Sequence, residues 1–291
     1  MPASTMPTHT MEAASRAAAE RFRRADRDPS PFLASAVEHL HALIRETRPS
    51  QEDWRAAIEF LTATGHAVDD KRQEWMLLSD VLGVSALVEE LNAPRPLGAT
   101  PNTVRGVFYR ADAPRYPLGT DISLDGKGDP LTVRGRVVDL DGHPIAGATV
   151  ETWQANAQGR YENQEPEAQP EHNLRGVFTT GADGGFHYRT VKPAGYALPD
   201  DGPVGALFRR IGCPMRRPAH LHFIIRAEPY ETISTHVFDG NDPDLSDDAL
   251  FGVRPELIGD FVPVCDPSGG RAWALDFTFV MARAKPKRDR P

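Results

Sequence analysis

The hydrophobic and polar positions divide this chain into two parts with different periodicities. Between residues 11 and 92 the apolar residues recur at helical spacing, as Phe32, Leu40 and Ile44 do, and glycine is rare. Ser50 is a favourable N-cap, and Gly83 divides the last helical run into two pieces. The pattern predicts helices over four segments: Met11–Asp26, Pro31–Arg45, residues 51–65 and Glu74–Leu91.

Beyond residue 98, short β-rich runs alternate with turn signals. The predicted strands span seven segments: Leu131–Leu140, Ala148–Trp153, Gly176–Thr180, Phe186–Val191, His220–Arg226, Thr232–Phe238 and Ala272–Met281. Asp183-Gly184-Gly185, between the third and fourth, is a hairpin signal. Strands of this length and spacing predict a β-sandwich. The fold class is therefore mainly β with an α-helical N-terminal segment. We expect a disordered tail over residues 1–10, a helical domain over 11–98, a β-sandwich domain over 99–283 and a basic tail over 284–291.

Composition narrows the class of protein. The chain has 291 residues and a formal net charge of −8, which argues against a nucleic-acid partner. No apolar run approaches the ~18 residues of a membrane span, and the first ten residues lack the apolar core of a signal peptide. Cys213 and Cys265 are the only cysteines; they could pair, but two free thiols in a reducing compartment fit better. We expect a cytoplasmic protein.

The pair His220 and His222 lies at the start of a predicted strand. Side chains of a strand repeat every two residues, so both imidazoles point to the same face. His39 and His41 have the same spacing but lie in a predicted helix, where positions two apart point about 200° apart, so they cannot chelate. Spacing alone leaves open that His220 and His222 are a hydrogen-bonded pair without a metal.

Tyr161 and Tyr196 favour a metal site over a hydrogen-bonded pair of histidines. Two imidazoles and two phenols without a carboxylate or thiolate suit a hard, highly charged metal, because a strong Lewis acid removes the phenol proton. Fe(III) fits this set better than Zn(II) or Fe(II).

Three segments carry a family resemblance. Residues 153–161 (Trp-Gln-Ala-Asn-Ala-Gln-Gly-Arg-Tyr), 193–196 (Pro-Ala-Gly-Tyr) and 217–222 (Arg-Pro-Ala-His-Leu-His) resemble the iron-binding segments of the intradiol ring-cleavage dioxygenases, in order and spacing. The resemblance covers roughly residues 35 to 280. Within the family it is strongest to the catechol and hydroxyquinol 1,2-dioxygenases, which also place a helical segment before the sandwich.

The resemblance implies one Fe(III) per chain, held by Tyr161, Tyr196, His220, His222 and a solvent hydroxide. It implies that a catechol-type diol binds through both oxygens and that dioxygen cleaves the ring between the two hydroxyl-bearing carbons. Tyr196, displaced by the diol, would accept a proton, which makes it a catalytic residue. Arg217 would lie beside the substrate and stabilise negative charge on the ring. His236 stands where family members carry glutamine or histidine near the iron, in a supporting role.

The resemblance also places a set of side chains around the substrate: Leu77, Asp80, Val104, Arg105, Gly106, Val107, Phe108, Leu198, Pro199, Arg217 and a residue near Phe251. An aspartate at position 80 is typical of hydroxyquinol cleavers, because a carboxylate can accept a hydrogen bond from the third ring hydroxyl. Asp80 also fits a helix N-cap. Arg105 and Val107 depart from the usual pattern, which leaves a catechol, a chlorocatechol or a carboxylated diol open.

Partners and rival classes complete the expectations. The resemblance implies a homodimer formed through the N-terminal helices, with a phospholipid in an apolar tunnel at the interface. One rival is a transthyretin-like or carboxypeptidase-regulatory binding module, which would hold no iron, since residues 133–150 also resemble that class. A cupin-type metal site would need an acidic residue three or four positions after the second histidine. The next one is Glu228, six positions after His222, so that pattern fails.

Overall fold

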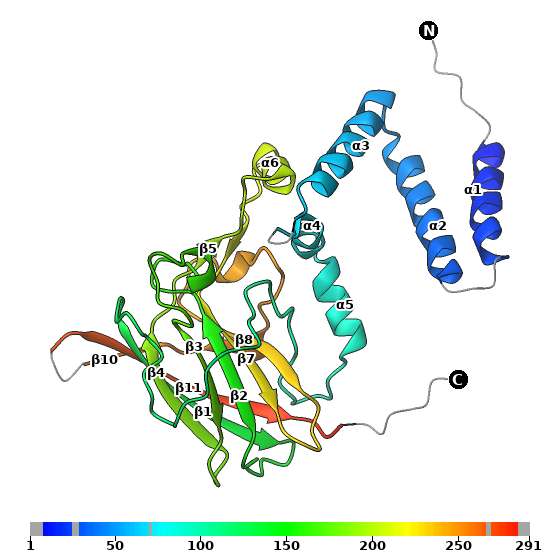
Figure 1. The fold of residues 1–291 in the computed structure, drawn as a ribbon. Coiled ribbons are helices and arrows are strands. Elements are labelled where there is room, and N and C mark those ends of the chain that lie inside the picture. Colours follow the sequence, from blue (N-terminus) through cyan, green and yellow to red (C-terminus); the bar gives the residue numbers. More distant parts are fainter. Residues whose placement is uncertain (1–7, 25–28, 70–71, 266–268, 285–291) are drawn as a thin grey trace. The chain divides into compact units, whose positions relative to one another are not determined.

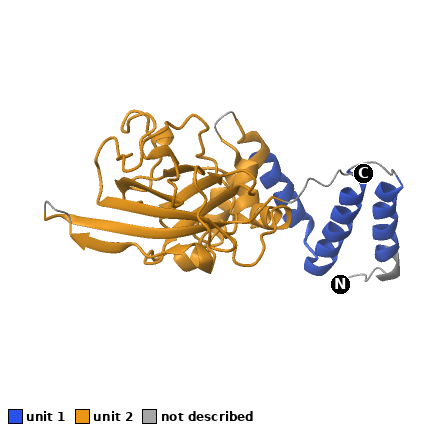
Figure 2. Cartoon of the chain, turned by 90° about the horizontal axis from the view of Figure 1, so that it is seen from below, with its two compact units in different colours: residues 1–63 blue, residues 64–291 orange. Residues whose placement is uncertain are grey.

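A computed structural model describes residues 8–24, 29–69, 72–265 and 269–284 of the chain. The chain forms two compact units, residues 1–63 and residues 64–291 (Figure 2). Residues 1–7 and 285–291 of the two predicted tails lie outside the described residues, and the first helix already begins at Thr8. No helix among the described residues is both long and apolar enough to cross a lipid bilayer. Cys213 and Cys265 are both free and exposed.

The first unit is helical, as the periodicity predicts. It contains α1 (Thr8–Arg23), α2 (Ser30–Thr47) and most of α3 (Gln51–His66). Helices α1 and α2 pack side by side, and Nδ1 of His41 lies 2.9 Å from Oγ of Ser15. Ser50 caps α3: its Oγ accepts a hydrogen bond from the Asp53 amide at 3.1 Å, and the Asp53 carboxylate accepts one from the Ser50 amide at 2.9 Å. This reciprocal pair is a capping box, which fixes the start of the helix.

Two short helices open the second unit. Helix α4 (Glu74–Val81) and helix α5 (Val84–Asn92) are separated by Gly83, whose φ of 72° is a left-handed conformation that glycine adopts without strain. The division that Gly83 predicts is therefore confirmed.

Two sheets pack face to face in the second unit (Figure 1). One has the strand order β10-β11-β1-β4, with β1 (Pro130–Asp139), β4 (Gly185–Val191), β10 (Val262–Cys265) and β11 (Arg271–Met281). The other has the order β3-β2-β7-β8-β9, with β2 (Thr149–Gln154), β3 (Arg175–Thr179), β7 (His220–Arg226), β8 (Ile233–Asp239) and β9 (Ile258–Gly259). The mainly β fold class with a helical N-terminal segment is confirmed.

Apolar residues from both sheets fill the space between them. Phe223 of β7 meets Phe186 of β4 and Phe279 of β11, with ring centroids 6.2 and 4.8 Å apart. All three side chains are almost completely buried. The sandwich thus has its own core, independent of the outer face of β7.

The prediction of a hairpin around Asp183-Gly184-Gly185 is wrong. The turn itself forms, since the Gly184 amide donates to the Gly181 carbonyl at 3.0 Å. Strand β3, however, pairs with β2, and β4 pairs with β1 in the other sheet. The same turn chemistry serves a hairpin and a connection between two sheets. Each flanking strand has a longer partner in its own sheet, so the chain crosses the sandwich here.

Short elements complete the second unit. Strands β5 (Tyr196–Ala197) and β6 (Arg216–Arg217) pair with each other, and helix α6 (Pro203–Arg210) lies between them in sequence. Three 3₁₀ helices span Glu162–Gln164, Leu245–Asp247 and Pro255–Leu257.

Candidate metal centre and substrate cavity

Strand β7 brings His220 and His222 together. Their Nε2 atoms lie 3.2 Å apart, and both side chains are only 2 % exposed. Leu221 and Phe223, at the alternate positions, point into the core of the sandwich. The two histidines therefore share the outer face of the sheet, as the spacing predicts. His39 and His41 lie in α2, where their spacing puts them on different sides of the helix.

The two tyrosines come from separate segments and meet the histidines. Tyr161 follows β2, and its hydroxyl lies 2.9 Å from Nε2 of His222 and 3.5 Å from the hydroxyl of Tyr196. Gly159 allows the two segments to approach, because a Cβ atom there would lie 2.8 Å from the Gly195 carbonyl oxygen. Its φ of 75° also favours glycine. All four predicted ligands thus converge on one point.

Aromatic rings stack on two of these four residues, Tyr161 and His222. The ring of Phe108 stacks on Tyr161 at a centroid distance of 4.3 Å, and the indole of Trp153 stacks on His222 at 4.5 Å. His236 of β8 lies opposite His222 in the strand register, with ring centroids 4.3 Å apart. Ligand atoms of His220, His222 and His236 all lie within 4.8 Å of one another. The family resemblance places His236 near the other two histidines, and the structure brings it there.

The electrostatics of this cluster fit a cation. Burial lowers the pKa of His222 and His236 well below the usual range and that of His220 to about 3, so all three imidazoles are neutral. Burial also raises the pKa of Tyr161 well above its ordinary value. Nδ1 of His222 and Nε2 of His236 are buried without a hydrogen-bond partner among the described residues. The neutral imidazoles of His220 and His222, whose Nε2 atoms lie 3.2 Å apart beside the Tyr161 hydroxyl, form a donor set that suits a bound metal.

Arg217 lies at the edge of the cluster, with 2 % of its side chain exposed. Its Nε donates to Oδ1 of Asp248 at 3.0 Å, its Nη2 donates to Oδ2 at 3.3 Å, and its Nη1 lies 3.5 Å from Nε2 of His220. Burial works to lower the pKa of Arg217, but Asp248 and the two tyrosines outweigh it and raise that pKa. The guanidinium is thus a fixed cation beside the four candidate ligands.

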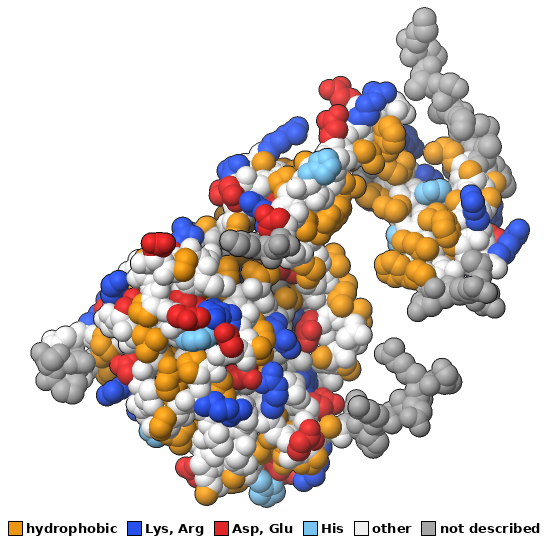
Figure 3. Space-filling view, in the orientation of Figure 1, with side chains coloured by type: hydrophobic (Ala, Val, Ile, Leu, Met, Phe, Trp, Pro, Cys, Tyr) orange, Lys and Arg blue, Asp and Glu red, His pale blue; other side chains and the backbone are white. Residues whose placement is uncertain are grey.

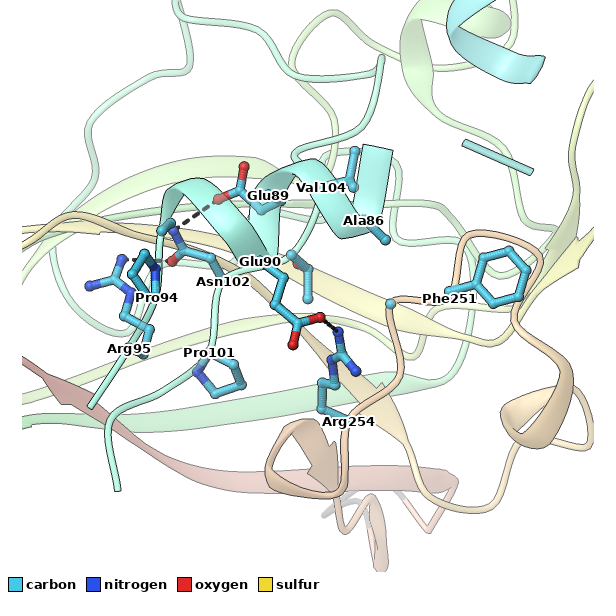
Figure 4. Close-up of a pocket in the computed structure, with 13 residues that line it drawn as sticks. Ala86, Glu89, Glu90, Pro94, Arg95, Pro101, Asn102, Val104, Phe251 and Arg254 are labelled. Carbon is cyan, nitrogen blue, oxygen red and sulfur yellow. Dashed lines mark hydrogen bonds and ion pairs between the residues drawn. The ribbon is translucent and has the colours of Figure 1, made fainter. Parts of the chain in front are cut away.

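A cavity of about 560 Å³ opens onto Tyr196, His222 and Arg217. Most of the side chains that we expect around the substrate line it: Leu77, Asp80, Gly106, Val107, Phe108, Leu198 and Pro199, with Leu250 as the residue near Phe251. Val104 lines a different and smaller cavity, of about 190 Å³ (Figure 4). Arg105 places its guanidinium 5.0 Å from the ring centroid of Tyr109. Gly106 has a φ of 79°, a left-handed conformation. It separates Arg105, which contacts Tyr109, from Val107, which lines the larger cavity.

Comparisons with known proteins decide the family. A family model described as "Dioxygenase" matches residues 110–283, and one described as "Catechol dioxygenase N terminus" matches residues 31–100. The chain is 46 % identical over 273 residues to hydroxyquinol 1,2-dioxygenase from a Rhizobium species, covering 90 % of this chain and 92 % of the relative. The chain belongs to the intradiol ring-cleavage dioxygenases. The rival binding-module class is thereby excluded.

Further relatives share the full architecture of this dioxygenase. The 6-chlorohydroxyquinol 1,2-dioxygenase of Cupriavidus pinatubonensis is 49 % identical over 250 residues, covering 86 % of this chain and 89 % of the relative. The crystal structure of hydroxyquinol 1,2-dioxygenase from Pseudomonas putida DLL-E4 superposes with a TM-score of 0.90 at 36 % identity, covering 96 % of this chain and 100 % of that chain. Catechol 1,2-dioxygenase from Pseudomonas arvilla C-1 gives a TM-score of 0.78 at 28 % identity, over 99 % and 97 %.

Asp80 lines the cavity of this dioxygenase. The sequence leaves it two interpretations, a substrate contact and a helix N-cap. It lies in the last turn of α4, so it is not an N-cap. The side chain is 6 % exposed, and its Oδ1 atom has no hydrogen-bond partner among the described residues. Burial raises the pKa of this carboxyl group, although Ser85 and Arg217 oppose the shift. Asp80 is thus a buried carboxyl group in the cavity lining with one oxygen unpaired among the described residues.

Several residues of the site were not found from sequence. Asp248, which fixes Arg217, stands in an acidic loop beside Asp244 and Asp247, and nothing in the pattern distinguishes it. The cavity lining includes further polar residues that the sequence analysis did not select: Asp69, Arg72, Gln73, Glu74, Gln164 and Asp201. Residues 69–74 supply four of them, and Gln164 and Asp201 come from distant segments, so no single local signal identifies the set.

Proposed function

We propose that this dioxygenase cleaves hydroxyquinol (1,2,4-trihydroxybenzene) with dioxygen, between the hydroxyl-bearing carbons 1 and 2, at an Fe(III) centre, giving a maleylacetate-type product. The observation that carries the substrate is Asp80, a buried carboxyl group in the cavity lining whose Oδ1 has no hydrogen-bond partner among the described residues. The relatives named as hydroxyquinol and 6-chlorohydroxyquinol 1,2-dioxygenases support the same choice.

Tyr161, Tyr196, His220 and His222 would hold the iron, one ion per chain. Neutral imidazoles and phenols that converge without a carboxylate suit a trivalent ion, which compensates for the charge of two phenolates. Bound there, the iron would supply Lewis acidity and would prepare the aromatic ring for reaction with dioxygen.

The chain's own residues supply the remaining functions. Tyr196 lines the cavity, where its phenolate would accept a proton from the diol. Arg217, held by Asp248, presents a permanent cation to the negative charge that develops on the ring. Leu77, Leu198 and Leu250 line the same cavity and would contact the ring and exclude water.

Substrate preference tests this proposal. A buried hydrogen bond to a charged group contributes about 1.5–3 kcal/mol, so hydroxyquinol should exceed catechol in kcat/KM by a factor of roughly 10–150. Asp80→Asn should keep part of this preference. Asp80→Leu should remove most of it and leave catechol turnover unchanged, which makes catechol the internal control. Ring-opening absorbance with catechol, 4-chlorocatechol, hydroxyquinol and protocatechuate would measure it.

The runner-up substrates are catechol and chlorocatechols, which the apolar part of the cavity lining also suits. Faster turnover of catechol than of hydroxyquinol, with a neutral Asp80→Leu, would assign the chain to that branch. A carboxylated diol has less support, because Arg105 stacks on Tyr109 and does not line the cavity.

The N-terminal helices support a homodimer. Phe32 and Leu40 of α2 are 73 % and 59 % exposed, and Trp54 of α3 is 51 % exposed. Figure 3 shows such hydrophobic side chains gathered on the surface of these helices. Contiguous exposed apolar surface indicates an interaction site, and a second copy of this chain is the occupant that we propose, with a phospholipid acyl chain between the copies. We also propose that the helical domain ends at residue 98 and the β-sandwich domain begins at residue 99, and that the protein is cytoplasmic.

Light scattering should report a dimer at micromolar concentration. Phe32→Asp should shift it towards a monomer by introducing a charge into the apolar face, whereas Glu52→Asp, at an exposed polar position, should not. A wild-type monomer at that concentration would contradict the dimer. Mass spectrometry of an organic extract of the purified protein would test for the phospholipid.

A further inference from the structure

Thr103 connects a loop to the histidine cluster. Its amide donates to the Ser234 carbonyl at 2.8 Å, and its hydroxyl is hydrogen-bonded to Nδ1 of His236. Thr103 is 6 % exposed and His236 is 1 % exposed, so both partners of this bond are buried. Thr103 also lines the smaller cavity, whose labelled residues include its neighbours Asn102 and Val104 (Figure 4). No feature of the sequence singled it out.

The direction of this hydrogen bond follows from the environment of the hydroxyl. A threonine hydroxyl has one hydrogen to donate, and the described residues offer that of Thr103 no acceptor other than Nδ1 of His236. If the hydroxyl accepted instead, its own hydrogen would have no partner among the described residues, which is unfavourable for a buried group. The hydroxyl therefore donates and Nδ1 accepts.

The proton of the imidazole is thereby placed on the other nitrogen. An imidazole whose Nδ1 accepts a hydrogen bond is not the charged form, because both nitrogens of that form carry hydrogen. A neutral imidazole with an accepting Nδ1 carries its hydrogen on Nε2. That atom is buried without a partner among the described residues, and the ring that carries it lies with its centroid 4.9 Å from that of His220 and 4.3 Å from that of His222. It is an N–H donor without an acceptor among the described residues.

We propose that Thr103 is a positioning residue that fixes the tautomer of His236, so that Nε2–H is presented as a hydrogen-bond donor to an anionic oxygen beside His220 and His222. The inference rests on the proposed function, which supplies such an oxygen in a bound, deprotonated diol or in reacting dioxygen. A donor aimed at developing charge lowers a reaction barrier without strengthening the binding of the neutral ring.

The tautomer can be measured without activity. ¹⁵N NMR of the iron-free, full-length protein with labelled histidine distinguishes a protonated from an accepting nitrogen, and His236→Gln identifies the signals of His236 among the ten histidines. We expect the proton on Nε2 in the wild type and in Thr103→Ser. In Thr103→Val, which removes only the hydroxyl, we expect a mixture of the two tautomers. A wild-type proton on Nδ1 would overturn the proposal and make His236 a third metal-ligand candidate.

Kinetics of the iron-loaded enzyme provide the second test. Loss of a partner that orients a group near a metal typically costs about 10–100-fold, so Thr103→Val should lower kcat by that factor with KM for the diol little changed. Thr103→Ser should restore kcat. In a His236→Gln background, Thr103→Val should add less than about a twofold loss, because the two residues act as one unit.

Thr235→Val is the matched control. Thr235 is 2 % exposed, and its hydroxyl has no partner among the described residues, so the same substitution removes no hydrogen bond. Equal losses in Thr103→Val and Thr235→Val, or equal losses in both backgrounds, would show a structural role and overturn the proposal. An inactive wild type would instead contradict the proposed function and leave the NMR result as the test of the tautomer.

Discussion

The variant His222→Ala is expected to purify without iron and without ring-cleavage activity while keeping its fold. The substitution removes the imidazole whose Nε2 lies 2.9 Å from the Tyr161 hydroxyl and 3.2 Å from Nε2 of His220, so the set of four donors is broken. Even an orienting partner of a metal ligand is worth about 10–100-fold in affinity or activity, and loss of a ligand should exceed that. Metal analysis and a ring-cleavage assay measure both effects.

The fold should survive because the histidines and the core lie on opposite faces of β7. Leu221 and Phe223 remain in the space between the sheets when His222 is shortened. Circular dichroism and a cooperative thermal transition would check this. The control is His39→Ala, since His39 lies in α2 with the same His-x-His spacing but outside the cluster. Similar losses of iron in both variants would refute the argument from strand geometry.

The second expected result concerns colour. Two phenolates bound to Fe(III) produce a broad charge-transfer band in the visible range, so Tyr161→Phe and Tyr196→Phe should each shift or bleach it. Tyr161 loses a hydroxyl that lies 2.9 Å from His222, and Tyr196 loses one that lines the cavity. Absorption spectra normalised to bound iron would measure the change.

Tyr188→Phe is the matched control for the two tyrosine variants. Tyr188 is buried like Tyr161, but its hydroxyl lies 3.1 Å from Oγ1 of Thr152 inside the sandwich. Its removal should leave the band in place. A band that survives in both Tyr161→Phe and Tyr196→Phe would mean that neither phenol binds the metal.

The sequence predicts the parts of this dioxygenase in which local periodicity decides the structure. The strand over His220–Arg226 is found with its observed bounds, and its alternation places both histidines on one face. Gly83 predicts the division between α4 and α5, because a left-handed conformation is a local demand on one residue. These features depend on the dihedral preferences of a few residues and on a repeat of two or 3.6.

Features that depend on distant segments were not predicted correctly. The Asp183-Gly184-Gly185 turn is read properly, but the partners of β3 and β4 are set by the packing of whole sheets. Strands β5 and β6 have two residues each, too few to show a period, yet their pairing puts Tyr196 opposite Arg217.

Single contacts made by tertiary structure are equally invisible to periodicity. Asp248 reaches Arg217 across 31 positions, and Thr103 reaches His236 across 133. Arg105 departs from its expected place for a similar reason: the left-handed turn at Gly106 leaves it beside Tyr109, where it contacts an aromatic face.

The central claim is that two tyrosinates and two histidines hold Fe(III) in this chain. The measurement that tests it most directly is the visible absorption spectrum of the purified wild-type protein, recorded together with its metal content. We predict a red-brown protein with about one iron per chain and a broad visible band, from the charge transfer of bound phenolate to Fe(III). A colourless protein that is fully loaded with zinc would contradict it.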